Sequence, residues 1–564
     1  MLIPILKSLK YTFSNAQIRV GSVIAIISLI GFSTVGNYGL SIDEAIEISM
    51  VKWNYELIAK GTPIPKDLRY YGTVFNVSAE VLFQVSELLE KGSLNMADTK
   101  DSSQLIRDRI KIKHPFTFLI SLLAYISVAA IVGIFCGFDY AWCGPIVLAL
   151  FPMFWGHSFF NPKDVPFAAL FILCSCVGAY VVERYVQKGS KTNIGFNNTT
   201  IISILYGILV GLNTSIRVGG LVLIPFTLIA YGVITLGSIK HHYKNWLNIA
   251  GFYGVMVIAW ATTTIICFPS SWANPIQWLF ETVGYLSDHS WKGIVLFEGK
   301  LFFDSTLPWY YIPKWVAMTL PLIFQVAFVF GIIFIISKYS KFSDLQRACA
   351  ILILLQIFFL PSVAIIKGSI IYNSIRQFLF ILPAIAAIAS TALVFLYQNI
   401  TKTIIQRFTV ASLAVVFTHI CFDMVALHPY EYIYFNRIFG GLTNAHTRYE
   451  TDYWGLSMRE AMEWVNRHSK PGTKVLVGGP FYAAKIFADP SLVFPNEGDF
   501  IKDGTTRINK LEKLVIDQPY YYIAAPMFDK HNSRRAYQQV FPECDVVYQV
   551  LRQKVPLAIV KHCR

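Results

Sequence analysis

The chain has 564 residues, of which 55% are hydrophobic and 15% are charged. Soluble domains carry roughly 25% charged residues, so this composition excludes an ordinary soluble protein and predicts a polytopic α-helical membrane protein. The formal net charge is +14, but the basic residues cluster between apolar runs, as in loops that face anionic lipid. We therefore expect a lipid bilayer as a partner and no nucleic acid.

About eleven apolar runs are long enough to span a bilayer, and they lie near 20–37, 114–136, 141–158, 164–183, 200–217, 219–236, 247–267, 316–337, 347–366, 377–397 and 405–425. Alternate loops between them are rich in Lys and Arg, which predicts a cytoplasmic amino end that leads into an uncleaved span. An odd number of spans then places the carboxyl-terminal segment on the outer face. The expected location is the plasma membrane, with multiple passes.

Two adjacent acids, Asp43 and Glu44, follow the first apolar run, where a helix should be leaving the bilayer. Acids at a lipid–water boundary are costly to hold there and indicate function by default. A structural role is compatible, because Ser41 and Glu44 have the spacing of a capping box. A carboxylate in this place could also act as a general base. Two amphipathic helices, at about 42–60 and 71–91, are predicted in the loop that follows.

A polar cluster at 157–164 stands at the mouth of the predicted bundle. Asn161 would be the N-cap of the next helix, and Asp164 would lie in its first turn. Capping requires neither His157 nor Lys163, so we favour a functional role for the cluster.

Arg217 and Arg376 each lie at the end of a span on the predicted outer face. Arginines at span ends commonly anchor a helix to lipid headgroups. Two of them on the outer side run against the usual charge distribution, and together with Lys163 they would form a phosphate-binding cluster.

The predicted outer loop at 268–315 is rich in aromatic residues, among them Trp291, Trp309 and Tyr310. Such residues commonly form a belt at the membrane interface. They would equally suit a wall that stacks on a sugar ring.

Beyond residue 427 the composition becomes that of a soluble protein. Helices and strands alternate there in the predicted order Ser457–His468, a strand from Lys474, Thr505–Asp517, Tyr520–Ala525, Val546–Leu551 and Leu557–Val560. This alternation predicts a small outer α/β domain at 428–564, beside a transmembrane domain at 1–427.

Seven of the nine cysteines lie in or beside apolar runs without metal-ligand spacing, as small buried residues do. Cys544 and Cys563 differ, because they lie symmetrically about Gln553 and Lys554, as if across the open end of a terminal hairpin. A disulfide between them is compatible with an oxidising outer face. Gln-Lys is a poor two-residue turn, so the register of that hairpin is only weakly specified.

Together, these outer-face residues would supply a base, cations for a phosphate and aromatic walls beside lipid. That combination suits transfer of a group from a lipid-linked phosphate donor to a hydroxyl. The sequence contains no Gly-rich nucleotide loop, P-loop or zinc motif, so a sugar nucleotide is not indicated. A transporter or flippase of a lipid-linked saccharide is the alternative, although such proteins show internal repeats that are not evident here. A membrane scaffold would leave the cluster at 157–164 unexplained.

At these residues the sequence resembles the GT-C class of integral-membrane glycosyltransferases, and most of all the bacterial relatives of protein O-mannosyltransferases and of the aminoarabinose transferases acting on lipid A. The matching segments follow one another along nearly the whole chain: Asp43-Glu44, His157 to Asp164, Trp291 to Gly299 with Leu307 to Tyr311, Ile371 to Pro383, and His428 to Asn436 with Tyr449 to Gly455. The ordered set is more specific than any one segment.

The resemblance implies a polyprenyl-phosphate-linked hexose or pentose donor, a glycan, lipid or protein acceptor, and an inverting displacement at the outer face of a bacterial inner membrane. It implies Asp43 as the general base, with Glu44 as its supporting partner. We expect donor-phosphate contacts from Lys163, Arg217, Arg376 and His157, and supporting or substrate contacts from Asn161, Asp164, Trp291, Trp309, Tyr310 and Tyr372.

Two points qualify the resemblance. Gln377 stands where many relatives have a basic residue, so one phosphate contact is absent or shifted. Some members of the wider class bind a divalent metal through acids, and Asp43, Glu44 and Asp164 could supply ligands. The nearer relatives are metal-independent, so we expect no metal and no other cofactor.

Overall fold

The computed structural model describes residues 14–65, 68–92, 102–188, 197–236, 246–287, 294–303, 307–495, 519–525 and 542–564. Nine helices of this part of the chain are long and apolar enough to cross a membrane. They are α2 (Asn15–Thr34), α5 (Ser102–Cys136), α8 (Asp164–Lys188), α10 (Leu223–Thr235, with the preceding 3-10 turn Val218–Val222), α12 (Trp246–Cys267), α15 (Leu322–Lys338), α16 (Asp344–Lys367), α17 (Ile381–Asn399) and α18 (Thr403–Leu427). The protein is therefore a polytopic helical membrane protein, as predicted.

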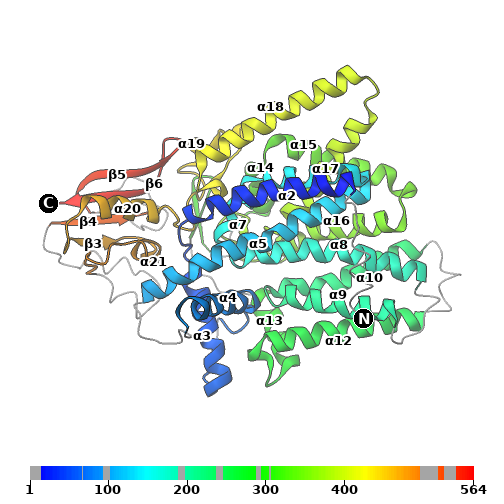
Figure 1. Ribbon diagram of the computed structural model, residues 1–564, viewed down its shortest axis with the longest axis horizontal. Coiled ribbons are helices and arrows are strands. Elements are labelled where there is room, and N and C mark those ends of the chain that lie inside the picture. The colour runs from blue at the N-terminus through cyan, green and yellow to red at the C-terminus, as the bar shows by residue number, and fades with distance from the viewer. Residues whose placement is uncertain are drawn as a thin grey trace.

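The central helix of the bundle is α8, which packs against α5, α16, α9 (Asn198–Thr214) and α10. The helices run side by side along the long direction of the molecule (Figure 1). The first residue of α8 is Asp164, so one member of the predicted polar cluster lies where the most enclosed helix begins.

Two of the predicted spans differ from a single long helix. The run at 141–158 forms α6 (Cys143–Ala149) and α7 (Pro152–Phe160), in a pair of segments bent by 75° at the break before Pro152. Pro152 occupies the start of α7, where a missing N–H costs nothing. The run at 200–217 forms α9, with only 17 residues. The described residues thus hold nine full-length helices, or ten with the bent pair as one span, where hydropathy predicted about eleven.

The two amphipathic helices of the first loop are present as α3 (Glu44–Lys60) and α4 (Val74–Lys91). They lie across the end of the bundle that also carries the carboxyl-terminal sheet (Figure 1). On α4, Phe75 and Phe83 pack inward, whereas Val81, Val85 and Leu89 are exposed. An outward apolar face of this kind suits a helix that lies on a membrane surface.

The second large loop and the segment after the last span add short elements: α13 (Pro275–Ser287), the antiparallel hairpin of β1 (Ile294–Phe297) and β2 (Lys300–Phe303), α14 (Tyr311–Thr319) and α19 (Gly441–Ala445).

The carboxyl-terminal region forms a four-stranded sheet with the order β3-β4-β6-β5. Its elements are α20 (Met458–His468), β3 (Lys474–Val477), α21 (Phe481–Lys485), β4 (Tyr520–Ala524), β5 (Asp545–Arg552) and β6 (Val555–Cys563). Strands β3 and β4 are parallel, and the other pairs are antiparallel. These elements match the predicted ones within two residues at most ends, while the predicted helix at 505–517 lies outside the described residues. The division of the chain at residue 427 stays a prediction.

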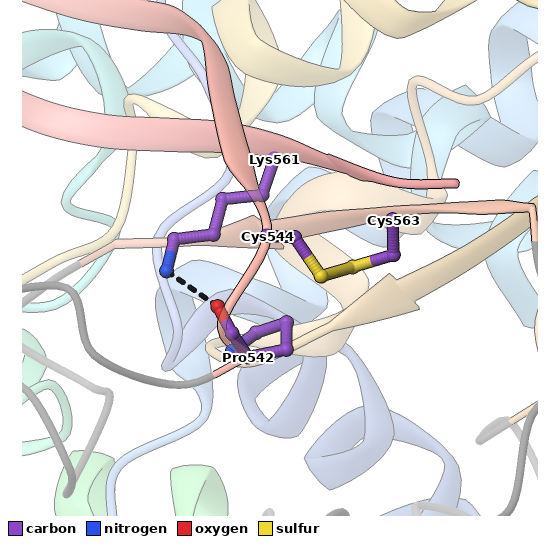
Figure 2. The surroundings of a disulfide bond; sticks show 4 residues. All are labelled: Pro542, Cys544, Lys561 and Cys563. Carbon is purple, nitrogen blue, oxygen red and sulfur yellow. Dashed lines mark hydrogen bonds between the residues drawn. A yellow bond between two sulfur atoms is a disulfide. The ribbon is translucent and has the colours of Figure 1, made fainter.

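A disulfide joins Cys544 and Cys563 (Figure 2). It closes the open end of the β5–β6 hairpin, whose turn is formed by Gln553 and Lys554 with φ of 48° and 68°. Both residues adopt the left-handed conformation that a two-residue hairpin turn requires, despite side chains that rarely favour it. Next to the disulfide, the Lys561 ammonium donates a hydrogen bond of 2.7 Å to the Pro542 carbonyl.

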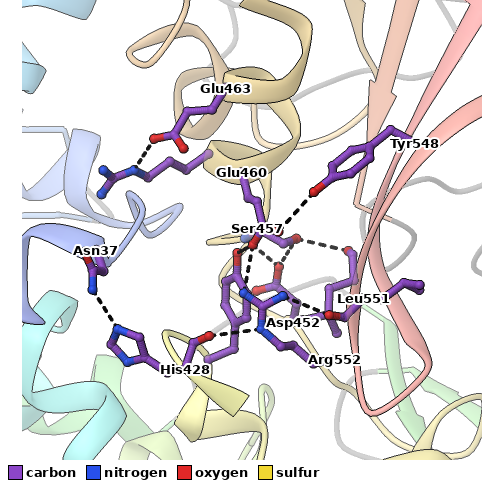
Figure 3. A network of polar contacts seen from close by, with 12 residues as sticks. Asn37, His428, Asp452, Ser457, Glu460, Glu463, Tyr548, Leu551 and Arg552 are labelled. Carbon is purple, nitrogen blue, oxygen red and sulfur yellow. Dashed lines mark hydrogen bonds and ion pairs between the residues drawn. The ribbon is translucent and has the colours of Figure 1, made fainter. Parts of the chain in front are cut away.

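A polar network fastens the sheet to the helix bundle (Figure 3). The Glu460 carboxylate on α20 accepts hydrogen bonds from Tyr548 at 3.1 Å and from Arg552 at 2.9 Å, both on β5. Arg552 also donates to the His428 carbonyl at 3.0 Å, and the His428 ring lies 2.9 Å from the Asn37 amide. The sheet is thereby connected to the ends of both α18 and α2.

Candidate active site

The two adjacent acids at the start of α3 have different surroundings. Glu44 is fully buried, and one of its oxygens accepts from the Ser41 N–H at 2.9 Å and from the Ser41 hydroxyl at 3.1 Å. The other oxygen lies 2.9 Å from His114 Nε2 on α5. Glu44 thus forms one half of the predicted capping box, since Asp43 rather than Ser41 is the N-cap residue.

Asp43 makes no capping hydrogen bond, and its side chain remains 35% exposed. Its Oδ2 atom accepts a hydrogen bond of 3.0 Å from Arg376 Nη1, and the arginine side chain is only 6% exposed. The reachable member of this ion pair is therefore the carboxylate.

Arg376 is held by aromatic rings as well as by Asp43. Its guanidinium lies 4.5 Å from the ring centroid of Trp454 and 4.9 Å from that of Tyr372. Such cation–π contacts orient the planar guanidinium without neutralising it. Two consecutive left-handed residues, Asn373 and Ser374, turn the chain immediately before it.

The predicted cap at Asn161 is present. The Asn161 side-chain oxygen accepts from the backbone N–H of Asp164 at 2.9 Å and of Lys163 at 3.3 Å. Its amide nitrogen donates to Asp164 Oδ2 at 2.9 Å and lies 3.0 Å from His157 Nδ1. Asn161 therefore supports the site by fixing the first turn of α8.

His157 does not occupy the place that we predicted for it. Its ring is fully buried, and Nε2 lies 3.0 Å from the Tyr453 hydroxyl while Nδ1 faces Asn161. Both ring nitrogens are engaged with protein groups, so His157 positions Asn161 and Tyr453, and the predicted phosphate contact would require it to release one of them. The sequence cannot distinguish a buried histidine at a span end from one that faces a ligand, because the difference lies in how the surrounding helices pack.

The remaining two predicted cations also form ion pairs. Lys163 Nζ lies 3.2 Å from Glu47 Oε1 and 3.6 Å from the centroid of the Tyr71 ring. Arg217 forms an ion pair with Asp164 at the start of α8.

The three ion pairs, of Arg376, Lys163 and Arg217 with their carboxylates, lie close to one another. Burial raises the pKa of the Tyr71 hydroxyl, and the charges that act on this group are those of Arg217, Asp43, Arg376 and Glu47. With Lys163 over the ring, three cations and two carboxylates from distant parts of the sequence thus act on one tyrosine. The third carboxylate, Asp164, interacts with the same three cations. The charges of the three ion pairs balance, so a bound phosphate would have to displace carboxylates from the cations.

Glu450 is a further acid beside this site that sequence reasoning did not select. It is buried, and one of its oxygens has no hydrogen-bond partner among the described residues. Burial raises the pKa of Glu450 to about 8. Hydrogen bonds from the backbone of Ser374 and Asn373 and the charge of Arg376 act in the opposite direction and lower this pKa, but burial has the larger effect. The neutral acid therefore lies against the turn that presents Arg376.

The predicted aromatic wall is only partly at the site. Tyr372 lies against Arg376, as described above. Trp309 is 71% exposed, and the Tyr310 hydroxyl donates a hydrogen bond of 3.1 Å to Glu298, which also pairs with Lys314. Among the described residues we find no contact between Trp309 or Tyr310 and the three ion pairs. Trp291 lies outside the described residues.

Glu47, Tyr71 and Trp454 are the site residues that we did not predict. Glu47 lies four residues after Asp43, on the same face of a helix that was predicted, so helical spacing could have found it. Tyr71 reaches the cations through tertiary packing, for which the local sequence carries no signal. Trp454 lies in the matching segment Tyr449 to Gly455, although it was not singled out there.

In the part of the chain that the structure describes, no group of three or more His, Cys, Asp or Glu side chains is arranged to hold a metal ion. The expectation that the protein needs no metal stays a prediction.

No family model matches the sequence, and no curated protein matches it. The fold is similar to that of ArnT from Cupriavidus metallidurans bound to undecaprenyl phosphate, with 13% identity, a TM-score of 0.48, and coverage of 96% of this chain and 97% of that chain. It is also similar to the oligosaccharyltransferase of Archaeoglobus fulgidus in the apo form, with 12% identity, a TM-score of 0.45, and coverage of 90% and 69%. Both are glycosyltransferases of the GT-C class, which the sequence motifs also resemble. At such low identity these likenesses concern the fold alone, and the function proposed below rests on the site.

Proposed function

We propose that this protein transfers a sugar from a polyprenyl-phosphate-linked donor to an acceptor hydroxyl at the outer face of the membrane, with inversion. The observation that carries the proposal is the convergence of Arg376, Lys163 and Arg217 on one neighbourhood, at Tyr71, that also holds an accessible carboxylate, Asp43. A phosphate at a membrane surface is the ligand that such a set of cations suits.

In the proposed reaction Asp43 is the general base. It takes the proton of the acceptor hydroxyl as that oxygen attacks the anomeric carbon from the face opposite the phosphate. The bond between the anomeric carbon and the phosphate oxygen breaks, and its electron pair leaves with the polyprenyl phosphate. The three cations stabilise the charge that grows on the departing phosphate.

The ion pairs observed here then describe the enzyme before the donor binds. Asp43 lies 3.0 Å from Arg376, so the donor would have to separate this pair in order to place one sugar between the base and the phosphate. As parts of the same proposal, the amino end is cytoplasmic, the sheet faces the outside of a bacterial inner membrane, and no metal takes part.

The proposal predicts that Lys163→Ala and Arg376→Ala weaken donor use more than acceptor use. Each variant should bind undecaprenyl phosphate at least about 10-fold less tightly, as expected when a charged hydrogen bond worth roughly 1.5–3 kcal/mol is lost. Binding to purified full-length protein in detergent measures this directly. Lys314→Ala is the matched control, because Lys314 pairs with Glu298 away from the three ion pairs. Equal losses for donor and acceptor, or a loss in the control, would contradict the phosphate assignment.

Comparison of envelope glycans from cells with and without the protein, by mass spectrometry, would identify the sugar and the acceptor. A transporter of a lipid-linked saccharide remains the rival, and the bent α6–α7 pair is the feature that favours it, because broken helices form transport sites. Purified protein in detergent distinguishes the two: an enzyme transfers sugar without a sealed membrane, whereas a transporter does nothing measurable there.

A further inference from the structure

One buried lysine near the site has no hydrogen-bond partner among the described residues. Lys113, in the polar first turns of α5, is 3% exposed, and its Nζ atom makes no hydrogen bond with any described residue. The neighbouring basic residues on the same helix are paired, since His114 contacts Glu44, and Arg109 donates two hydrogen bonds, of 2.6 and 2.7 Å, to Glu80. A buried charge without a partner is expensive, so its presence needs a reason.

Lys113 lines a small cavity between α3, α4 and α5, together with Ile48, Asn76, Glu80 and Arg109. The cavity has an empty volume of about 230 Å³, which includes open solvent at its mouth. Pockets for separate ligands usually measure roughly 300–1,000 Å³. The space therefore suits a side chain or a water molecule better than a substrate.

Glu47 lies beside this cavity and links it to the site. One Glu47 oxygen lies 3.2 Å from Lys163, and the other accepts a hydrogen bond from Asn76, which lines the cavity. Asn76 also has a buried side-chain oxygen without a partner. Glu47 thus lies between a site cation on one side and the cavity of Lys113 on the other.

The carboxylates that act electrostatically on Lys113 are those of Glu44, Glu47 and Glu80. Glu44 is fixed by Ser41 and His114, and Glu80 by Arg109. Of the three, Glu47 is the carboxylate whose present cation, Lys163, is assigned to the donor under the proposed function. A phosphate at Lys163 would repel Glu47, because two anions would then share one ammonium. Lys163 itself would stay in place through the Tyr71 ring.

We propose that Lys113 is the reserve counter-ion for Glu47: when the donor phosphate binds Lys163, the Glu47 carboxylate turns past Asn76 to pair with Lys113. Lys113 is then a positioning residue that lets the donor displace a carboxylate without leaving that carboxylate buried and unpaired. This inference rests on the proposed function, since it takes the donor phosphate to bind at Lys163.

In this scheme Lys113 is unfavourable in the donor-free protein and useful in the donor-bound one. Lys113→Met should therefore raise the thermal midpoint of the donor-free protein, because a lone buried charge is removed. The same variant should bind undecaprenyl phosphate about 10-fold less tightly, a coupling within the range for interacting groups. Lys113→Arg should restore the affinity, because it restores the cation. A merely structural lysine would not give opposite effects on stability and binding.

A double-mutant cycle with Glu47→Gln tests the inference in the purified full-length protein. Glu47→Gln alone should tighten the binding of undecaprenyl phosphate, because the competing carboxylate is gone. In that background Lys113→Met should change the affinity by less than about 2-fold. Lys111→Met is the matched control on the same helix, where the side chain is 67% exposed, and it should change neither property. If Lys113→Met does not fold, Lys113→Gln provides the same comparison.

Two results would overturn the inference: an equal loss of affinity from Lys113→Met in both backgrounds, or no loss in either. Failure of the proposed function looks different. If Lys163→Ala leaves the binding of undecaprenyl phosphate unchanged, the donor site itself is misplaced. If Lys163→Ala weakens binding while Lys113→Met does not, the donor site stands and the reserve counter-ion is refuted.

Discussion

Asp43 and Glu44 are neighbours in the chain, yet their surroundings give them separate tasks. Glu44 is enclosed and hydrogen-bonded to Ser41 and His114, so it holds the first turn of α3 against α5. Asp43 is partly exposed and touches Arg376 alone among the site cations. A base must be reached by the acceptor, and only Asp43 meets that condition.

Asp43→Asn should abolish sugar transfer while the protein stays folded. The amide oxygen can still accept the hydrogen bond from Arg376, but an amide does not take a proton at neutral pH, so the rate should fall by about 10²–10⁴-fold. Transfer to envelope glycans and the thermal midpoint, measured side by side, check both halves of this expectation. Asp139→Asn, at an exposed acid elsewhere in the chain, is the control. Transfer at the wild-type rate by Asp43→Asn would refute the base assignment.

Glu450 should make the stability of the protein fall as the pH rises from 4.5 to about 8. Its folded pKa, raised by burial to about 8, lies above the usual value of 4.5. The stabilising contribution is therefore complete below pH 4.5 and is lost as the pH rises through 8, by at most about 1.4 kcal/mol per pH unit. Ionised Glu450 would also disturb the Asn373–Ser374 turn that presents Arg376.

Glu450→Gln should remove this dependence, because the amide does not ionise. Thermal midpoints and undecaprenyl phosphate affinities at pH 6 and pH 9 test the expectation. A wild-type protein and a Glu450→Gln variant that lose stability in parallel over this range would show that other groups titrate instead.

Among the secondary-structure elements, we expect the β5–β6 hairpin to depend on its disulfide. The turn residues Gln553 and Lys554 are poorly suited to their left-handed conformation, and the Cys544–Cys563 bond closes the opposite end over a separation of 19 residues. Loops of this size are stabilised by about 3 kcal/mol in the chain-entropy model.

Reduction, or a Cys544→Ser/Cys563→Ser double variant, should therefore lower the stability of the carboxyl-terminal sheet by about 3 kcal/mol. Urea unfolding followed by limited proteolysis of the sheet measures the change. The double variant itself should be indifferent to reductant. A wild-type protein whose sheet is equally indifferent would argue against a structural role for the bond.

Element boundaries were predictable from sequence where the end of a helix is decided locally. Asn161 caps α8 as its position suggested, and β3 begins at Lys474 as predicted. Helix α5 was predicted about twelve residues too short at its start, because hydropathy rejects the charged residues before 114, Arg109 and Lys113 among them. Arg109 finds a carboxylate on α4, and pairing across helices cannot be seen in a sequence window.

The site was predictable to a similar degree. Asp43 stood out because acids at the lipid boundary are costly, and Lys163, Arg217 and Arg376 because basic residues on the outer side are unusual. The structure brings all four together. Two of their partners, Asp164 and Tyr372, were also predicted. The two partners of Lys163, Glu47 and Tyr71, were missed because glutamates and tyrosines near polar loops are common. His157 was predicted to contact the donor phosphate, because the sequence does not reveal that both of its ring nitrogens contact protein groups.

Across the whole molecule, the segment after the last span is built into the end of the bundle. Tyr430, Tyr432 and Ile433 are buried in the same core as the membrane helices. Gly39 approaches the backbone of Leu456 so closely that an added Cβ would lie 2.5 Å from its carbonyl oxygen. Trp454 covers Arg376, and Tyr453 meets His157.

Trp454 therefore makes the region beyond residue 427 a part of the candidate site and more than an appendage to it. A chain cut after α18 would leave the guanidinium of Arg376 uncovered on one side. In a hybrid that combines these helices with the tail of a related protein, the side chain that covers Arg376 in the proposed donor site would come from the other protein. Donor preference in such hybrids should follow the origin of the tail as well as that of the helices.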